Sequence, residues 1–311
     1  MDRVICIAGP TASGKTALSV ALAQAVDGEV VSCDSMQIYK KMDIGTAKPT
    51  VEEMAGVPHY MLSVAEPEED FSVSRYCEMA TPIVEDILAR GKTAIIAGGT
   101  GLYMDALIRG NTFAPYPSTG RREELEKLAR EQGIEAVLCK LREVDPQSAE
   151  RLHPSDQKRI IRAMEVYLET GETITEHNRK TQEIPPRFQP IWFALDDVER
   201  SSLYKRIDER VLRMLKDGLI VEIEALLNSG VPEKATSMQA IGYKEFVDAI
   251  HGRISMEEAT ALVQQASRHY AKRQLTWFRR NKNIHWLRRE EGENTSEILC
   301  RARQILRDFD N

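Results

Sequence analysis

The sequence contains no apolar run that approaches the length of a membrane span, which needs about 20 consecutive apolar residues. Its first residues are charged and lead directly into an apolar segment at 4–8, so the pattern of an export signal is also missing. Internal repeats and low-complexity tracts are absent. With 311 residues, of which 42% are hydrophobic and 29% charged, we expect one or two ordinary domains in the cytoplasm, without membrane contact.

Cysteine and histidine are few and scattered. The five cysteines, Cys6, Cys33, Cys77, Cys139 and Cys300, form no Cys-x-x-Cys pair, and the six histidines stand singly. Structural zinc sites use closely spaced ligand pairs, and secreted disulfide frameworks use an even set of cysteines in a short chain. We therefore expect reduced thiols and no zinc site, as is typical of a cytoplasmic protein.

A complete phosphate-binding loop follows the apolar segment 4–8. It reads Gly9, Pro10, Thr11, Ala12, Ser13, Gly14, Lys15 and Thr16, and a helix-like segment at 17–25 comes next. Backbone N–H groups of such a loop point into one concavity, where the lysine adds positive charge and the threonine hydroxyl ligates Mg²⁺. The pattern predicts a diphosphate site with Mg²⁺ held at Thr16. The alternative is a glycine turn without a ligand.

Two further apolar segments end in polar or glycine-rich residues. Segment 29–33 leads into Asp34, and segment 93–97 leads into Gly98-Gly99-Thr100. In a parallel sheet with helices on both faces, ligands bind at the carboxyl ends of the strands, so these ends are expected to converge on the phosphate loop. Asp34 then acts as a general base, as a magnesium ligand through water, or only as a turn residue.

The pattern of apolar runs predicts an α/β fold, with a phosphate-loop core whose parallel sheet is flanked by helices, plus a smaller all-helical insertion domain. The core is expected from residues 1–111 and 191–311, and the insertion from residues 112–190. Within the insertion, a turn-rich segment at 113–120 precedes two helical patterns, and 174–190 reads as loose chain.

Six segments in order carry a family resemblance. They are Asp34-Ser35-Met36-Gln37-Ile38-Tyr39, residues 42–49, residues 98–103, His153-Pro154-Ser155-Asp156 with Arg159 and Arg162, residues 206–218, and Ile241-Gly242-Tyr243. Together they resemble the tRNA dimethylallyltransferases, also called isopentenyl-tRNA transferases, in the bacterial form without a zinc finger. The resemblance implies transfer of a dimethylallyl group from dimethylallyl diphosphate to the exocyclic N6 amine of the adenosine just 3′ of the anticodon. It also implies the tRNA anticodon stem-loop as partner, and no obligate protein partner is evident.

The resemblance assigns catalytic roles to Asp34, Thr100 and Arg210. Adenine's amine is a poor nucleophile, so a carboxylate that takes its proton assists bond formation, and the family pattern gives this role to Asp34. It places the Thr100 hydroxyl near the reacting base and Arg210 beside the departing diphosphate. On a helix, Arg210 shares a face with Arg206 and Arg213. A solvated face paired with neighbouring acids is the alternative.

The resemblance also implies a set of tRNA contacts, for which the adenosine must be flipped out of its loop. The set comprises Asp34, Ser35, Met36, Gln37, Thr100, Arg122, Gln157, Lys158, Arg159, Ile160, Ile161, Gln239, Ile241, Gly242 and Tyr243. For Gln37 and Thr100 the alternative is that they only satisfy backbone groups at strand ends. If the insertion clamps the tRNA, its cations lie over the anticodon stem.

The chain lacks an overall positive charge, since its net charge is −6. One segment, 259–289, nevertheless has eight basic residues and no Asp or Glu: Arg268, Lys272, Arg273, Arg279, Arg280, Lys282, Arg288 and Arg289. Aromatic residues lie between them: Tyr270, Trp277, Phe278 and Trp286. We expect RNA contact here, although the aromatics also suit the core beneath a solvated face.

Two other functions suit the phosphate loop. A kinase of a small metabolite or nucleotide uses the same loop with an Asp base and an arginine-bearing lid. A non-catalytic RNA-binding protein uses it as a nucleotide switch. Both imply ATP or GTP in the loop, and ATP competition for it stays an open question.

Overall fold

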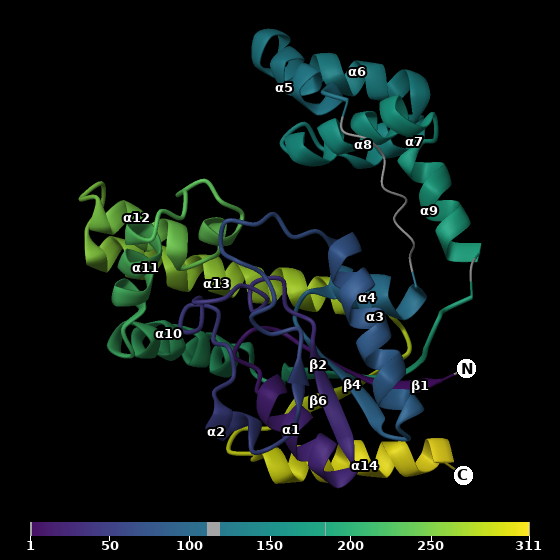
Figure 1. The fold of residues 1–311 in the computed structure, drawn as a ribbon, viewed down its shortest axis with the longest axis vertical. Coiled ribbons are helices and arrows are strands. Elements are labelled where there is room, and N and C mark those ends of the chain that lie inside the picture. Colours follow the sequence, from purple (N-terminus) through teal and green to yellow (C-terminus); the bar gives the residue numbers. More distant parts are fainter. Residues whose placement is uncertain (1, 111–118, 184, 311) are drawn as a thin grey trace. The chain divides into compact units, whose positions relative to one another are not determined.

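The computed structural model describes residues 2–110, 119–183 and 185–310 (Figure 1). The chain divides into two compact units, which we call the sheet unit, residues 1–110 and 187–311, and the helical unit, residues 111–186. Most of the expected turn-rich segment, at 113–118, lies outside the described residues. The predicted fold class, an α/β core with an all-helical insertion, is confirmed.

One six-stranded parallel sheet forms the centre of the sheet unit, with the order β3-β2-β4-β1-β5-β6. The strands are β1 Arg3–Ala8, β2 Gly28–Ser32, β3 His59–Tyr60, β4 Thr93–Gly98, β5 Gln189–Asp197 and β6 Ile284–Arg289. Strands β1, β2 and β5 are almost wholly buried, as expected of a parallel sheet covered on both faces, which requires continuous apolar runs.

The register of the sheet brings three loops to one level. Ala8 at the end of β1 pairs with Gly98 of β4, and Ser32 at the end of β2 pairs with Ala97 of β4. The phosphate loop, the turn at Asp34 and the turn at Thr100 therefore start side by side at the carboxyl edge of the sheet.

The remaining regular elements of the sheet unit are helices. Those of the sheet unit are α1 Lys15–Ala25, α2 Val51–Met54, α3 Val73–Ala89, α4 Gly101–Arg109, α10 Arg200–Lys216, α11 Leu219–Asn228, α12 Tyr243–Ile250, α13 Met256–Phe278 and α14 Thr295–Asp310, with a 3-10 turn at Ser237–Gln239. α1 and α14 lie side by side against one face of the sheet (Figure 1). There Leu22 and Ile298 share a buried cluster with Phe193 of β5.

The helical unit consists of helices α5 Arg121–Gln132, α6 Ile134–Val144, α7 Pro146–Arg151, α8 Gln157–Thr170 and α9 Ile174–Glu183. Leu125, Val137, Leu141 and Met164 belong to its own buried core. The expectation of loose chain from residue 174 is wrong, because α9 covers its first part.

Local contacts explain why α9 forms. The Thr173 hydroxyl accepts the backbone N–H of Glu176 at 3.1 Å, which caps the first turn. Arg179 pairs with both Glu176 and Glu183 one turn away on either side, an arrangement that stabilises exposed helices.

The chain leaves and re-enters the sheet unit at one place. The backbone N–H groups of Arg187 and Phe188, at the return point, donate to the carbonyl of Ile108 in α4 at 3.0 and 3.3 Å. No helix within the described ranges is long and apolar enough to cross a membrane.

Candidate active site

The phosphate loop connects β1 to α1 and is braced from α10. The Lys15 ammonium donates to the carbonyl of Pro10 at 2.7 Å, across the loop. Arg206 of α10 donates from Nε to the carbonyl of Ala12 at 3.1 Å and pairs with the carboxylate of Asp197. Asp197 lies at the end of β5 and its side chain is buried. The loop is thus held in shape by the protein itself, which lowers the cost of ordering it around a ligand.

A cavity of about 1030 Å³ opens over this loop. It is lined by Lys15 and Thr16 of the loop, by Asp34 after β2, and by Arg210 of α10. These residues come from three distant parts of the sequence and are all partly buried. Two cations, a hydroxyl and a carboxylate therefore face one space large enough for a small diphosphate and part of a nucleoside.

Burial of the two cations perturbs both. Burial, opposed by the nearby Asp34 and assisted by Arg210, lowers the pKa of Lys15 to about 8. Burial likewise lowers the pKa of Arg210, again with Asp34 opposing. Desolvated cations of this kind are stabilised by a bound anion, so the cavity favours a polyanionic ligand such as diphosphate.

Asp34 is oriented by the turn in which it lies. Its Oδ1 accepts the backbone N–H of Met36 at 2.9 Å and of Gln37 at 3.4 Å. The side chain is therefore fixed with respect to the strand end while it lines the cavity. Asp34 therefore both stabilises the turn and lines the cavity, so its structural role is compatible with a catalytic one.

Thr100 is tied to the neighbouring turn. Its hydroxyl oxygen accepts the backbone N–H of Ser35 at 3.0 Å and donates to the Ser35 hydroxyl at 3.3 Å. Ser35 is one of the cavity-lining residues, whereas Thr100 is not. Tyr270 of α13 lines the cavity too, and its hydroxyl interacts with that of Thr100.

The three arginines of α10 lie on one face, as their spacing predicted. Arg206, Arg210 and Arg213 all line the cavity. Arg206 and Arg210 are partly buried, whereas Arg213 is exposed, as the alternative of a solvated face expects. The adjacent acid Asp208 pairs with Arg268 of α13. Arg206 contacts the phosphate loop, and Arg210 and Arg213 line the cavity beside it.

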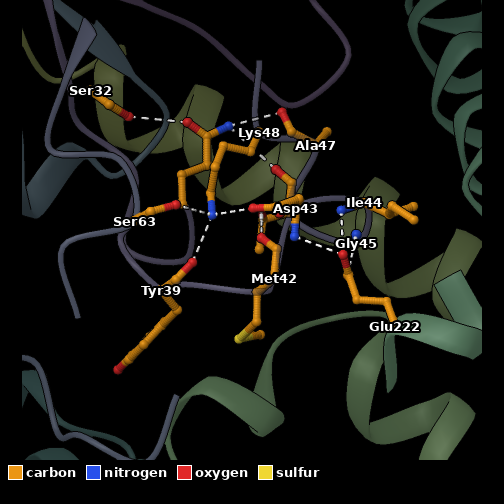
Figure 2. A network of polar contacts seen from close by, with 12 residues as sticks. Ser32, Tyr39, Met42, Asp43, Ile44, Gly45, Ala47, Lys48, Ser63 and Glu222 are labelled. Carbon is orange, nitrogen blue, oxygen red and sulfur yellow. Dashed lines mark hydrogen bonds and ion pairs between the residues drawn. The ribbon is translucent and has the colours of Figure 1, made fainter. Parts of the chain in front are cut away.

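Gln37 has both ends of its side chain engaged within the protein. Its Oε1 accepts the Ser32 hydroxyl at 3.1 Å, and its Nε2 donates to the carbonyls of Thr46 and Ala47 at 3.3 and 3.0 Å. Figure 2 shows this network, in which the Lys48 ammonium also contacts Tyr39, Asp43 and Ser63. The expected alternative, that Gln37 satisfies backbone groups, describes these contacts.

Glu222 of α11 holds the loop at residues 43–45. Sequence reasoning missed this residue. Its carboxylate accepts the backbone N–H groups of Asp43, Ile44 and Gly45 at 2.8, 2.8 and 3.1 Å (Figure 2). It also accepts the Tyr243 hydroxyl at 2.6 Å. A Cβ at Gly45 would lie 2.5 Å from the Tyr243 ring, so only glycine fits there. Glu222 resembles any surface acid in the sequence, and no local signal marks it.

The motif at 241–243 lies partly inside the fold. Tyr243 and Gly242 are buried, while Ile241 is half-buried and Gln239 is exposed. Gln239, Ile241 and Gly242 line the cavity. Burial and the Glu222 carboxylate together raise the pKa of Tyr243 well above its usual value. Tyr243 therefore acts as a neutral hydrogen-bond donor inside the protein.

The expected tRNA contacts in the helical unit fall into two groups. Gln157, Lys158 and Arg159 are exposed in the first turn of α8, and Arg122 of α5 is half-buried beside Glu126 and Glu165. The other group, Ile160 and Ile161, is buried in the core of the unit. These two isoleucines hold α8 in place, and their side chains are not at the surface.

The basic segment 259–289 is less uniform than its sequence suggests. Arg268 pairs with Asp208, and Arg279 with Asp196 of β5 at 3.1 Å. The Trp277 indole N–H donates to Asp105 at 2.9 Å, and Phe278 lies in the core. Acids from other elements thus neutralise part of the segment, and some of its aromatics are structural, in line with the alternative interpretation.

A second residue that sequence reasoning missed is Gln274 of α13. It lines the cavity and is only 5% exposed. Its side chain contacts both the phosphate loop and the turn before Thr100. Among the described residues, no group of three or more His, Cys, Asp or Glu side chains converges as a metal site.

Comparisons with known proteins place these features in context. A family model described as IPP transferase matches residues 37–281. A tRNA dimethylallyltransferase of Acetivibrio thermocellus is 42% identical over 310 residues, which are 99% of each chain. The structure of a tRNA isopentenylpyrophosphate transferase from Bacillus halodurans has 39% identity and a TM-score of 0.74, with 98% of this chain and 96% of that chain covered. A structure described as a eukaryotic dimethylallyltransferase acting on tRNA has 30% identity and a TM-score of 0.80, with 93% of this chain and 74% of that chain covered.

Proposed function

Because the chain belongs to the IPP transferase family of tRNA dimethylallyltransferases, we propose that it transfers the dimethylallyl group of dimethylallyl diphosphate to the N6 amine of the adenosine just 3′ of the anticodon, with release of diphosphate. The family resemblance of the six sequence segments is confirmed. The kinase and the nucleotide switch are set aside, since the relatives compared are prenyltransferases of tRNA.

The observation that carries the proposal is the meeting of Lys15 and Arg210 around Asp34 in one cavity. In the reaction, the bond between the allylic carbon and the diphosphate oxygen breaks, and the bond between that carbon and N6 forms. The diphosphate leaves with the electron pair of the broken bond. The loop N–H groups, Lys15 and Arg210 stabilise the charge that it gains.

Asp34 takes the proton that N6 loses. Its carboxylate is held by the backbone N–H of Met36 and lines the same cavity as the cations, so it is oriented before substrate arrives. We propose that Ser35, which lines the cavity, and Thr100, which is hydrogen-bonded to Ser35 at the adjacent turn, position the base. Their hydroxyl groups are suited to the ring nitrogens and sugar of a flipped adenosine.

Magnesium fits the oxygen groups of the cavity. The Thr16 hydroxyl lines it at the start of α1, with the Asp34 carboxylate in the same space, and Mg²⁺ prefers oxygen ligands with several waters and substrate phosphates. Thr16 would hold the ion. With Mg²⁺ held there, charge on the leaving diphosphate would be neutralised.

The tRNA is proposed to contact both units. In the sheet unit the contacts are Asp34, Ser35, Met36, Thr100, Gln239 and Ile241, with Gln37, Gly242 and Tyr243 supporting them from within. In the helical unit they are Arg122, Gln157, Lys158 and Arg159, with Ile160 and Ile161 supporting α8. Phosphate contacts from the cations fix the register of the RNA. The activity is proposed to take place in the cytoplasm without an obligate protein partner.

Incubation with undermodified tRNA and one candidate donor at a time tests the proposal. The donors are dimethylallyl diphosphate, ATP and GTP. We expect the tRNA mass to increase by one dimethylallyl group, at the adenosine beside the anticodon, and only with dimethylallyl diphosphate. Consumption of ATP or GTP with no change in tRNA mass would contradict the proposed function. ATP added to the complete reaction then shows whether it competes for the loop.

A further inference from the structure

We infer that Gln274 is a positioning residue for the transfer reaction, and that its side-chain amide sets the separation between the phosphate loop and the turn that carries Thr100. This inference rests on the proposed function. The phosphate loop is the side of the site that holds the leaving group, and the turn is the side that receives the adenosine. A residue that joins the two sides controls the distance over which the prenyl group is transferred.

The two hydrogen bonds of Gln274 run to opposite sides of the site. Its Oε1 accepts the backbone N–H of Thr11, in the phosphate loop, at 2.9 Å. Its Nε2 donates to the carbonyl of Gly99, the residue before Thr100, at 3.0 Å. Gln274 itself comes from α13, far along the chain, so it fixes both loops from a third element.

The chemistry of these contacts requires an amide. One partner is a donor and the other is an acceptor, so the side chain must offer both an oxygen and an N–H group. Gln274 is almost fully buried, where an unmatched polar group is costly. A carboxylate would face the Gly99 carbonyl without a proton to donate, and an apolar side chain would leave both backbone groups unmatched.

The contact is also close. A Cβ at Gly99 would lie 2.1 Å from Nε2 of Gln274. The backbone of Gly99, which has no side chain, therefore lies directly against the amide. This close approach leaves little freedom for the distance between the turn and α13 to change. Any side chain at this position would push the turn and α13 apart.

The position of the turn passes on to the proposed general base. The Thr100 N–H donates to the carbonyl of Cys33 at 3.2 Å, and the Thr100 hydroxyl holds the N–H of Ser35 at 3.0 Å. Asp34 lies between these two bonded residues. A shift of the turn relative to the phosphate loop thus moves Asp34 relative to the leaving group. A misplacement of about 1 Å costs on the order of 100-fold in rate.

Single-turnover kinetics of Gln274→Ala test the inference. We expect the rate of prenyl transfer to fall about 10- to 100-fold, while the Kd values for dimethylallyl diphosphate and for tRNA stay within about threefold of wild type. Gln264→Ala is the matched control, because Gln264 lies on the same helix and its amide donates to the Asp208 carbonyl on α10. That variant is expected to react at the wild-type rate.

Gln274→Glu adds a readout that a purely structural role would not move. The introduced carboxyl is buried and faces a carbonyl, so its pKa rises, and only its protonated form donates to Gly99. The rate of this variant divided by the wild-type rate should therefore increase as the pH falls from about 8 to about 6. Gln265→Glu, at an exposed position on the same helix, should show a flat ratio.

The outcomes separate this inference from the proposed function. If wild type transfers the prenyl group and Gln274→Ala does so at the same rate, the positioning role is wrong and the function stands. The same holds if the Ala variant is slower only through weaker substrate binding. If Gln274→Ala does not fold, a flat pH ratio for Gln274→Glu overturns the inference. If wild type transfers nothing, the proposed function fails, and the inference fails with it.

Discussion

The Tyr243 hydroxyl donates to the Glu222 carboxylate at 2.6 Å, and the same carboxylate accepts three consecutive backbone N–H groups of the loop at Asp43. This pair joins α11 and α12 to a loop that lines the cavity. It explains why position 45, which lies against the buried Tyr243 ring, requires a glycine.

Glu222→Ala is predicted to lower the free energy of unfolding by about 1–3 kcal/mol, because four donors are left without their acceptor. Denaturant unfolding measures the change. Glu224→Ala, at an exposed position on the same helix, should shift stability by less than about 0.5 kcal/mol. Equal stability of both variants would mean that water replaces the carboxylate at no cost.

Asp34→Asn tests the general base. The amide keeps the shape of the side chain and removes the proton acceptor, so the single-turnover rate should fall about 10²- to 10⁴-fold while tRNA and dimethylallyl diphosphate still bind. If Asp34 instead acts on the metal through water, excess Mg²⁺ should restore part of the rate. A near-normal single-turnover rate at all Mg²⁺ concentrations would mean that Asp34 has only a structural role in its turn.

Lys15→Ala and Arg210→Ala are each predicted to cost on the order of 2–4 kcal/mol in transition-state stabilisation, since each removes a desolvated cation from the leaving group. Affinity for tRNA should change little. Lys205→Ala is the control, because Lys205 is exposed on the same helix as Arg210. A variant of Lys15 or Arg210 that failed to bind tRNA but used dimethylallyl diphosphate normally would contradict the assignment.

Affinity for diphosphate is predicted to fall as the pH rises through about 8. Burial lowers the pKa of Lys15 to about 8, so the free protein carries the Lys15 charge below this pH and loses it above. A bound anion raises that pKa again, so binding above pH 8 takes up a proton. Calorimetry in buffers of different ionisation enthalpy measures the uptake. Lys15→Met should bind weakly with no such pH dependence, and an equally pH-dependent variant would exclude Lys15 as the source.

Lys158→Ala and Arg159→Ala are predicted to flatten the salt dependence of tRNA binding, by about 0.7–0.9 in log–log slope for each RNA phosphate that the variant no longer neutralises. Both residues are exposed on α8. Arg279→Ala should change the slope less, because Asp196 already neutralises Arg279 in part. Filter binding across a salt series gives the slopes. Unchanged slopes for both α8 variants would identify these side chains as ordinary solvated cations.

The sequence predicted the parts of the site that short segments encode. The phosphate loop at 9–16 and the polar residue Asp34 directly follow apolar strands, so their meeting at one sheet edge follows from the parallel order alone. The arginines of α10 needed only helical spacing. The fold class followed from the same alternation of strands and helices.

What the sequence could not show depends on partners far along the chain. Glu222 and Gln274 look like ordinary polar residues of helices. Their role is to bind backbone groups of loops that lie elsewhere in the sequence. The neutralisation of Arg268 and Arg279 by Asp208 and Asp196 is invisible to a window over residues 259–289. The sequence left open whether Gln37 contacts the RNA or satisfies backbone groups, and the structure shows its amide bonded to the carbonyls of Thr46 and Ala47.

The junction at Ile108 and Arg187 allows the helical unit to change in evolution independently of the sheet. The backbone enters and leaves the helical unit at two points that are hydrogen-bonded to each other. These hydrogen bonds keep the two ends of the connection close together, whatever the length of the chain between them. The helical unit can therefore change in length and in surface while the strand order of the sheet unit stays the same.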